Sequence, residues 1–294
     1  MSNVKTIKKD NKSIASRLRM LRKSPTAFIG AIIVSIVILS GIFAPWIAPY
    51  DPIKTDLYSR LTPPCKEHLL GTDKLGRDVL SRIIWGARVS LKVGVISVGI
   101  GMIIGVILGL VGGYFGGMTE KSIFSIVDLM LSLPSLLLAL AIIATLGPGI
   151  WQVMTAVGIS LIPIFARVTR GSVLTVKEQN YVLAAKALGG SNIVIMVRHI
   201  LPNILTPIIV MATLYCAFAI VMEAALSFLG IGIQPPEPSW GSILSNGQQQ
   251  IRYATWISTF SGLAITITVL GFNLLGDGLR DLLDPNMRRI MQSE

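Results

Sequence analysis

The segment Tyr181–Asn203, with the sequence YVLAAKALGGSNIVIMVRHILPN, lies between two apolar runs that are each long enough to cross a membrane. Lipid cannot satisfy its polar side chains, among them Lys186, Arg198 and His199, or the backbone freed around Gly189-Gly190. The segment therefore requires water or a protein partner, and its pattern predicts a hairpin of two short helices.

Each arm of this hairpin has a predicted apolar face. In the first arm the residues at the i, i+3, i+4, i+7 spacing of an amphipathic helix are Tyr181, Ala184, Ala185 and Leu188. In the second arm the residues on one side are Ile193, Met196, Val197 and Ile200. Gly189 and Gly190 end the first helix. Ser191 or Asn192 can cap the second helix, which is expected to end at Leu201-Pro202. A ridge of small residues followed by a glycine hinge is suited to docking into a groove of another protein.

Composition places the chain in a membrane. Its 294 residues are 52% hydrophobic and 14% charged, with a mean hydropathy of +0.69, whereas soluble domains carry roughly 25% charged residues. We therefore expect an all-α integral membrane protein of the cytoplasmic membrane. Cys65 falls in a polar loop and Cys216 in an apolar run, so neither a disulfide nor a C-x-x-C metal site is expected.

Six apolar runs approach the roughly 20 residues that a helix needs to cross a bilayer. They are Ala27–Ile47, Leu91–Val111, Ile123–Leu146, Val153–Ala166, Ile204–Leu229 and Trp256–Leu275, and the fourth is short unless it begins near Ile150. The first run exceeds the roughly 7–15 apolar residues of a signal peptide, so we expect an uncleaved span. The predicted organisation is a basic tail (1–26), a first transmembrane helix (27–48), an external segment (49–90), a five-helix core (91–278) with the hairpin at 179–203, and a C-terminal tail (279–294).

The basic residues orient these spans. Eight of the 26 Lys and Arg residues precede Pro25, opposed by Asp10 alone, which predicts a cytoplasmic N-terminus by the positive-inside rule. Six crossings then return the C-terminus to the cytoplasm and place the basic segment Arg167–Asn203 on the same side. Asp51–Ser90 is expected outside although it holds seven basic residues, because five acids nearly balance them and long loops cross with less regard to charge.

Four residues inside the predicted spans are candidates for a transport pathway or gate. Asp128 and Glu223 are carboxylates within apolar runs, where ionisable groups are costly and often functional. A proton-coupled transporter would need such groups, but a structural or inter-subunit hydrogen-bonding role is the preferred interpretation. Pro134 and Pro163 each remove a helix hydrogen bond and favour a kink, which either gates a pore or only bends the packing.

Glycines recur every four residues on one face of the second span, at Gly101, Gly105, Gly109 and Gly113. Such a strip lets another helix approach closely, and that neighbour is either a helix of this chain or one of a second membrane subunit. The strip is no nucleotide site, because it lies in an apolar run and no Walker-type lysine follows. The sequence contains no Ser/His/Asp set and no H-E-x-x-H, so we expect no enzyme activity, no cofactor and no metal.

The hairpin resembles the cytoplasmic coupling loop of the membrane subunits of ABC importers. The pattern of that loop is roughly E-A-A, three residues, Gly, about nine residues, and I-x-L-P. The residues at the matching places are Leu183, Ala184, Ala185, Gly189, Ile200, Leu201 and Pro202. Leu183 stands where many members have Glu, a departure that concerns one polar contact to the ATPase and not the hinge. The E-A-A at Glu223–Ala225 is a decoy, because it lies in an apolar run without the trailing Gly and Leu-Pro.

Three further stretches are similar to the dipeptide/oligopeptide importer permeases and, within that group, to the second, C-type, membrane subunit. They are HLLGTDKLGRDVLSRIIWGARVSLKVG (His68–Gly94), QPPEPSWGSIL (Gln234–Leu244) and FNLLGDGLRDLLDP (Phe272–Pro285). The resemblance runs from about Arg19 to Pro285 and implies the type I ABC importer permease fold. It also implies a second permease as heterodimer partner, two ABC ATPase subunits and an extracytoplasmic binding protein, with no nucleic acid.

The function implied is that of a permease subunit for di- or oligopeptides, in which the ATPases push the docked hairpin and rock the spans from inward- to outward-facing. Nickel and haem importers share the same pattern, so a metal-chelate or haem importer is the alternative of the same class. A proton-coupled secondary transporter using Asp128 and Glu223 is the alternative of another class. A membrane scaffold without transport would explain neither the hairpin nor the glycine strip.

Overall fold

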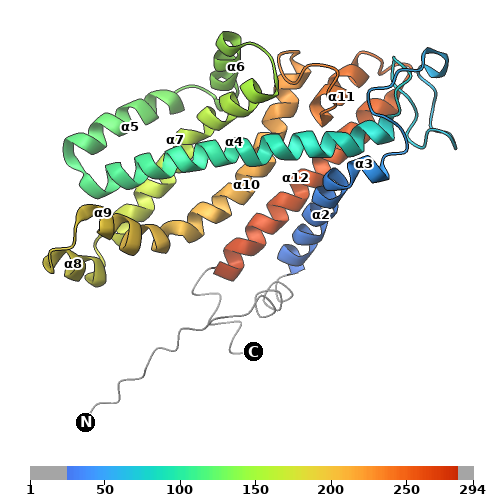
Figure 1. Ribbon diagram of the computed structural model, residues 1–294. Coiled ribbons are helices and arrows are strands. Elements are labelled where there is room, and N and C mark those ends of the chain that lie inside the picture. Colours follow the sequence, from blue (N-terminus) through green and yellow to red (C-terminus); the bar gives the residue numbers. More distant parts are fainter. Residues whose placement is uncertain (1–24, 284–294) are drawn as a thin grey trace.

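The computed structural model describes residues 25–283, which form a bundle of long helices (Figure 1). In chain order the elements are α2 (Pro25–Ile42), α3 (Ala44–Ile47), η1 (Leu57–Ser59), α4 (Val79–Phe115), α5 (Gly117–Leu131), α6 (Ser135–Leu146), α7 (Ile150–Val176), α8 (Asn180–Ala187), α9 (Asn192–Val194), η2 (Ile195–Ile200), α10 (Leu201–Phe228), α11 (Trp240–Gln248) and α12 (Thr255–Leu283). The basic residues before Pro25 and most of the predicted C-terminal tail lie outside the described residues.

The helices agree with the six predicted spans in number. Five helices of the described part are long and apolar enough to cross a membrane, and α5 with α6 makes a sixth if that bent pair is one span. Several helices are longer than predicted, among them α7 and α4. α7 begins at Ile150, which gives the fourth span the length that the apolar run alone lacked. α4 begins at Val79, because the carboxylate of Asp78 accepts a hydrogen bond from the backbone of Ser81 and caps the helix. Residues 79–90, predicted as part of the external segment, are therefore helical.

The run Ile123–Leu146, predicted as one span, is broken. α5 and α6 are bent by 92° relative to each other, and Pro134 lies in the break, as the residue that precedes α6. A proline has no backbone N–H and disfavours helix at the residue before it. Pro134 therefore separates two helices instead of kinking one, whereas Pro163 lies inside α7 and is buried.

The glycine strip packs within the chain. α4 lies along α7, and a Cβ atom added at Gly105 would stand 2.6 Å from the Cβ of Phe165 and 2.7 Å from the carbonyl oxygen of Ile162. Gly101 meets Leu161 at the same 2.6 Å. Real Cβ atoms do not approach so closely, so the glycines are what allows the backbones of α4 and α7 to come together. Of the two neighbours expected for the strip, the helix of this chain is the correct one.

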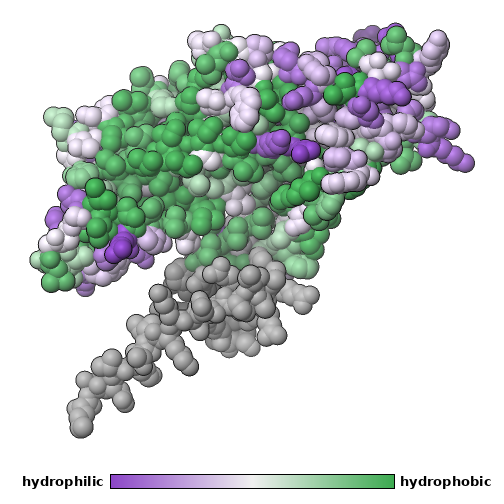
Figure 2. All heavy atoms as spheres, viewed as in Figure 1, coloured by the Kyte–Doolittle hydropathy of each residue, from purple (hydrophilic) through white to green (hydrophobic). Residues whose placement is uncertain are grey.

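The remaining helices surround this pair and give the molecule two distinct ends. α10 contacts α4, α7 and α12, and α2 packs against α12. α8 and α9 lie at the end where α2 begins and α12 finishes, which we call the hairpin end (Figure 1). The opposite end, here the loop end, carries α3, residues 48–78 and α11. Figure 2 shows apolar side chains over the middle of the bundle and hydrophilic ones gathered at the loop end.

Candidate functional site

The hairpin turns at its glycines as predicted. α8 finishes in a Schellman motif, in which the N–H of Gly190 donates to the carbonyl of Ala185 and the N–H of Gly189 to that of Lys186, both at 3.0 Å. Gly189 has a φ of +81°, a conformation that glycine adopts without steric cost. The sequence thus dictates this corner locally.

The second arm begins as predicted but does not end as predicted. The hydroxyl of Ser191 accepts a hydrogen bond of 3.4 Å from the N–H of Val194, which identifies Ser191 as the cap. The expected end at Leu201-Pro202 is wrong, because α9 runs through η2, a π-helical segment, directly into α10. Pro202 follows the π-helical segment directly, in the first turn of α10, and does not end the helix.

The two sides of the hairpin differ in their contacts. The side chains that enter the main core of the bundle are Val182, Ile195, Met196 and Ile200. The apolar side chains left exposed are Tyr181, Leu183, Leu188, Ile193, Val194 and Val197, with Leu188 88% and Ile193 70% exposed. The predicted face of the first arm is thus mostly exposed. The predicted face of the second arm is only half correct, because the wider π-helical turn carries Ile195 to the core in place of Ile193 and Val197.

The hairpin is tied to the ends of the long helices. The hydroxyl of Tyr114, in the last turn of α4, donates a 2.8 Å hydrogen bond to Asn192. The ammonium group of Lys177, just after α7, donates to the carbonyl of Gly113 at 3.0 Å. The first bond ties the hairpin to α4, and the second joins the segment just before the hairpin to the same helix.

Glu223 lies deep in the bundle. Its side chain is fully buried, and it accepts hydrogen bonds from the hydroxyls of Ser227 and Ser239 at 2.8 Å and of Ser90 at 3.4 Å. Ser227 belongs to α10, Ser239 is the residue before α11, and Ser90 belongs to α4. The hydrogen-bonding role expected for Glu223 is therefore present within this chain, and Ser90 and Ser239 are partners that sequence reasoning missed.

Asp128 is paired and lies on the surface. Its carboxylate accepts a 2.7 Å bond from Arg167 of α7, and both side chains are about 60% exposed. A second ion pair between the same helices joins Glu120 and Arg170. α5 is therefore held against α7 by two charge pairs, neither of which the sequence analysis identified.

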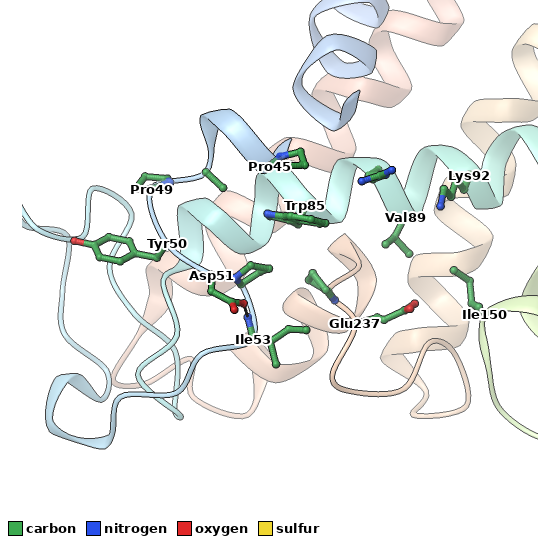
Figure 3. Close-up of a pocket in the computed structure, with 14 residues that line it drawn as sticks. Pro45, Pro49, Tyr50, Asp51, Ile53, Trp85, Val89, Lys92, Ile150 and Glu237 are labelled. Atoms are coloured by element: carbon green, nitrogen blue, oxygen red, sulfur yellow. Dashed lines mark hydrogen bonds between the residues drawn. The ribbon is translucent and has the colours of Figure 1, made fainter. Parts of the chain in front are cut away.

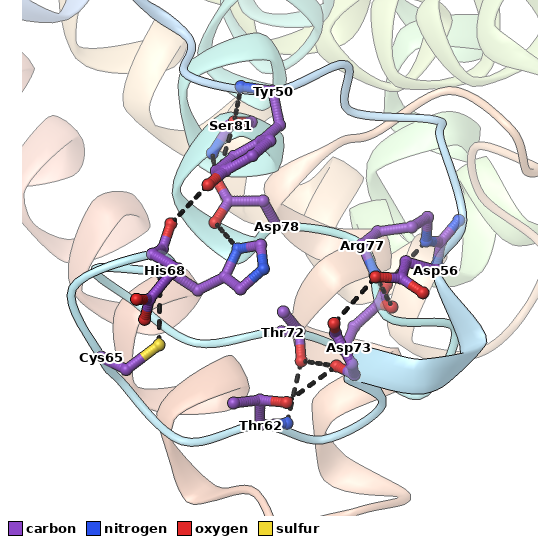
Figure 4. A network of polar contacts seen from close by, with 12 residues as sticks. Tyr50, Asp56, Thr62, Cys65, His68, Thr72, Asp73, Arg77, Asp78 and Ser81 are labelled. Atoms are coloured by element: carbon purple, nitrogen blue, oxygen red, sulfur yellow. Dashed lines mark hydrogen bonds and ion pairs between the residues drawn. The ribbon is translucent and has the colours of Figure 1, made fainter.

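Residues 50–78 at the loop end form a dense polar network (Figure 4). Asp73, almost fully buried, accepts bonds from the backbone N–H of Leu75 and from both the backbone and the guanidinium of Arg77. The ring of His68 lies 2.9 Å from Asp78, the residue that caps α4. Near the surface, the Ser59 hydroxyl and the N–H of Tyr58 donate to Asp56 and lower the pKa of its carboxyl.

A cavity of about 670 Å³ opens beside this network (Figure 3). Its lining comes from α3 and the loop that follows it, from α4, from the start of α7 and from the loop before α11. Sequence reasoning missed it because these segments are far apart in the chain. The one available signal is the spacing of Arg88 and Lys92, which places two cations on one face of α4. Among residues 25–283, no group of three His, Cys, Asp or Glu side chains could hold a metal ion.

Comparisons with known proteins extend these observations. Residues 101–289 match the binding-protein-dependent transport system inner membrane component family, and residues 15–64 match the N-terminal TM domain of oligopeptide transport permease C. The chain is 46% identical over 270 residues to the dipeptide transport system permease protein DppC of Alkalihalophilus pseudofirmus, covering 92% of this chain and 89% of that protein. It is 42% identical over 266 residues to the probable D,D-dipeptide transport system permease protein DdpC of Escherichia coli K12, covering 90% and 89%. It is 44% identical over 271 residues to the glutathione transport system permease protein GsiD of Escherichia coli O157:H7, covering 92% and 89%.

A solved structure shows the same fold. A chain of the MetNI methionine ABC transporter, in an inward-facing conformation, matches with a TM-score of 0.57 and 18% identity, covering 69% of this chain and 97% of that one. The family matches and the relatives confirm the resemblance to the importer permeases, and they support the importer interpretation over a secondary transporter. The chain belongs to the binding-protein-dependent transport family and is a multi-pass inner membrane permease of an ABC importer.

Proposed function

We propose that this chain is the permease subunit of an ATP-driven importer for short peptides and forms half of the pathway across the cytoplasmic membrane. Its relatives are named for dipeptides, D,D-dipeptides and glutathione. These compounds differ in chirality and linkage but share a free ammonium and a free carboxylate. Nickel, haem and other metal chelates, the cargo of the alternative importers, do not share that chemistry.

The hairpin, in this proposal, is the surface on which an ATPase subunit docks. The observation that carries it is the exposure of large apolar side chains of the hairpin, such as Leu188 and Ile193. Contiguous exposed apolar surface of this kind marks an interaction site. Because the second arm continues through η2 into α10 without a break, displacement of the hairpin would move a spanning helix directly.

Docking of the ATPases on the hairpin fixes which side of the membrane each end of the bundle faces in this proposal. The hairpin end and both chain termini face the cytoplasm, where two ATPase subunits bind. The loop end faces outward, where an extracytoplasmic binding protein contacts residues 51–90 and 234–253. A second, non-identical permease completes the pathway, and the break at Pro134 and the proline in α7 are the proposed points of flexion between states.

The complex itself is the first test. The tagged chain would be purified in mild detergent from its own membranes, and the proteins that come with it identified by mass spectrometry. We expect a sister permease, P-loop ATPases and a binding protein with a peptide retained on it. Recovery of the chain alone, under conditions that preserve other membrane complexes, would contradict the proposal.

The second test is Gly189→Val. A β-branched residue at a φ of +81° is strained by about 1–2 kcal/mol, which opens the Schellman turn and changes the angle between the two arms. We expect ATPase subunits to be lost from the complex and ATP-dependent uptake to fall about tenfold, with unchanged amounts of the chain in the membrane.

The matched control for this substitution is Gly147→Val. Gly147 has a φ of +83° and, like Gly189, has open space where a Cβ would stand, but it follows α6 and lies away from the hairpin. This variant should keep its ATPases. Equal retention of the ATPases by both variants would remove the hairpin from the docking site.

A further inference from the structure

The cavity at the loop end carries unpaired charges of both signs. Arg88 and Lys92 come from α4, and Glu237 comes from the loop before α11. The guanidinium of Arg88 lies 5.9 Å from the ring centre of Trp85, but within residues 25–283 neither cation and no oxygen of Glu237 takes part in a salt bridge. Asp51 adds a second carboxylate, which accepts only the N–H of Ile53.

Buried hydrogen bonds connect the two walls that carry these opposite charges. Ser90 lies on α4 between Arg88 and Lys92, and it donates to Glu223 while accepting from the N–H of Trp240 at 3.3 Å. Ser239, two residues after Glu237, donates to the other oxygen of Glu223. One fully buried carboxylate therefore connects the helix that carries Arg88 and Lys92 to the loop that carries Glu237, and so fixes the backbones of both walls relative to each other.

We propose that this cavity is the acceptor site that takes a zwitterionic peptide from the binding protein, with Arg88 and Lys92 on the carboxylate and Glu237 on the ammonium group. The inference rests on the proposed function. It goes beyond that function by naming a peptide-binding site on this chain and the part of the peptide that each residue contacts.

The chemistry of the lining favours a zwitterion over other ligands. A site for a simple anion would not place Glu237 and Asp51 beside the cations, and a site for an apolar molecule would not leave four charges exposed. Charge-assisted hydrogen bonds to both ends of a peptide are stronger than neutral ones and do not depend on its side chains. Ring and proline surfaces, from Trp85 and the prolines near Tyr50, supply the apolar part of the lining. A volume of about 670 Å³ lies within the usual range of small-molecule pockets.

The function of such a site is to retain the peptide when the binding protein opens. A peptide that is not retained returns to the outside while ATP hydrolysis continues, so the number of peptides moved per ATP decreases. A defect in peptide retention lowers this ratio. A defect in docking instead changes the concentration of binding protein needed for half-maximal hydrolysis.

The test uses the whole complex in proteoliposomes, with binding protein and an equimolar mixture of neutral dipeptides and tripeptides outside. Peptides that enter are quantified by mass spectrometry alongside ATP hydrolysis. We expect Glu237→Gln and Lys92→Gln each to lower the peptides moved per ATP about tenfold, the effect of one lost charge-assisted hydrogen bond. The rate of hydrolysis and the half-saturating concentration of binding protein should not change. The controls are Lys121→Gln and Asp277→Asn, which alter exposed charges outside the cavity and outside the segments proposed to contact the binding protein.

Three outcomes would be decisive. Unchanged peptide-to-ATP ratios in both cavity variants, with normal uptake by the wild type, would overturn the acceptor site and leave the proposed function intact. A higher half-saturating concentration of binding protein with an unchanged ratio would make these charges a docking surface and overturn the inference as well. Absence of ATP-dependent peptide uptake in the wild-type complex would instead refute the proposed function itself.

Discussion

Two segments lie outside the bundle at its opposite ends, and they differ in which side chains they bury. Residues 50–78 bury polar groups against each other, so that Thr72, Asp73 and Arg77 are each at most 5% exposed. The hairpin at 180–200 buries only four large apolar side chains and leaves six exposed. The loop segment thus satisfies its buried polar groups within this chain, whereas the hairpin leaves most of its large apolar side chains uncovered.

This difference predicts where substitutions affect folding and where they affect assembly. Removing a group from the loop network leaves buried partners without a hydrogen bond, which lowers the stability of the chain itself. Changing an exposed side chain of the hairpin leaves the isolated chain unaffected and weakens a contact with a partner.

The largest effect is expected for Asp73→Ala in the loop network. Asp73 is the carboxylate nearest to two buried guanidiniums, at 2.7 Å from Arg77 and 3.7 Å from Arg82. Removal of one partner of a buried ion pair costs about 3–5 kcal/mol. We expect lower thermal stability of the purified chain and rapid proteolysis of residues 50–78 in membranes. Asp51→Ala, at an exposed carboxylate of the same end, should change neither measurement, and an equally stable Asp73→Ala protein would show that the network is not needed for folding.

The next effect is expected for Ile193→Asp in the hairpin. Ile193 is 70% exposed, so the stability of the chain alone should change by less than about 0.5 kcal/mol. In the complex, loss of one buried aliphatic side chain costs about 1.5–3 kcal/mol of binding free energy. In a titration of the reconstituted complex, we therefore expect the ATPase concentration needed for half-maximal binding to rise correspondingly.

Leu69→Asp is the matched substitution at the loop end. Leu69 is 61% exposed and lies at the end opposite the hairpin, so this variant should bind the ATPases normally. If both substitutions weakened ATPase binding equally, the effect would be a general one and the hairpin would lose its assignment. If neither did, the exposed apolar side chains would have another partner.

Sequence predicted the parts of the molecule that depend on local signals. The turn at Gly189 and the cap at Ser191 follow from residue types that act within a few positions of the chain. The membrane-length runs predicted the spans because burial in lipid requires a minimum of apolar residues. The break at Pro134 was only partly foreseen, since a proline inside an apolar run is compatible with either a kink or two separate helices.

Other features depend on contacts between distant segments and could not be predicted in this way. The face of the second arm was wrong because η2 is π-helical, which changes the periodicity on which the prediction relied. Of the three serines that bond Glu223, only Ser227 stands at a helical spacing from it, while Ser90 and Ser239 are brought in by packing. The cavity at the loop end combines side chains from five segments, so its charges come together only in the folded chain.

The smallest effect is expected between the two ends, at the pair of Asp128 and Arg167. Both side chains are about 60% exposed, and an exposed pair contributes about 0–1 kcal/mol and is screened by salt. A double-mutant cycle with Asp128→Asn and Arg167→Gln should therefore give a small coupling energy in thermal unfolding of the purified chain, and ATP-dependent uptake should be close to that of the wild type. A coupling above about 2 kcal/mol would mean that the pair is shielded from water. Loss of uptake in Asp128→Asn with unchanged stability would instead place Asp128 in the pathway and make it a functional residue belonging to neither end.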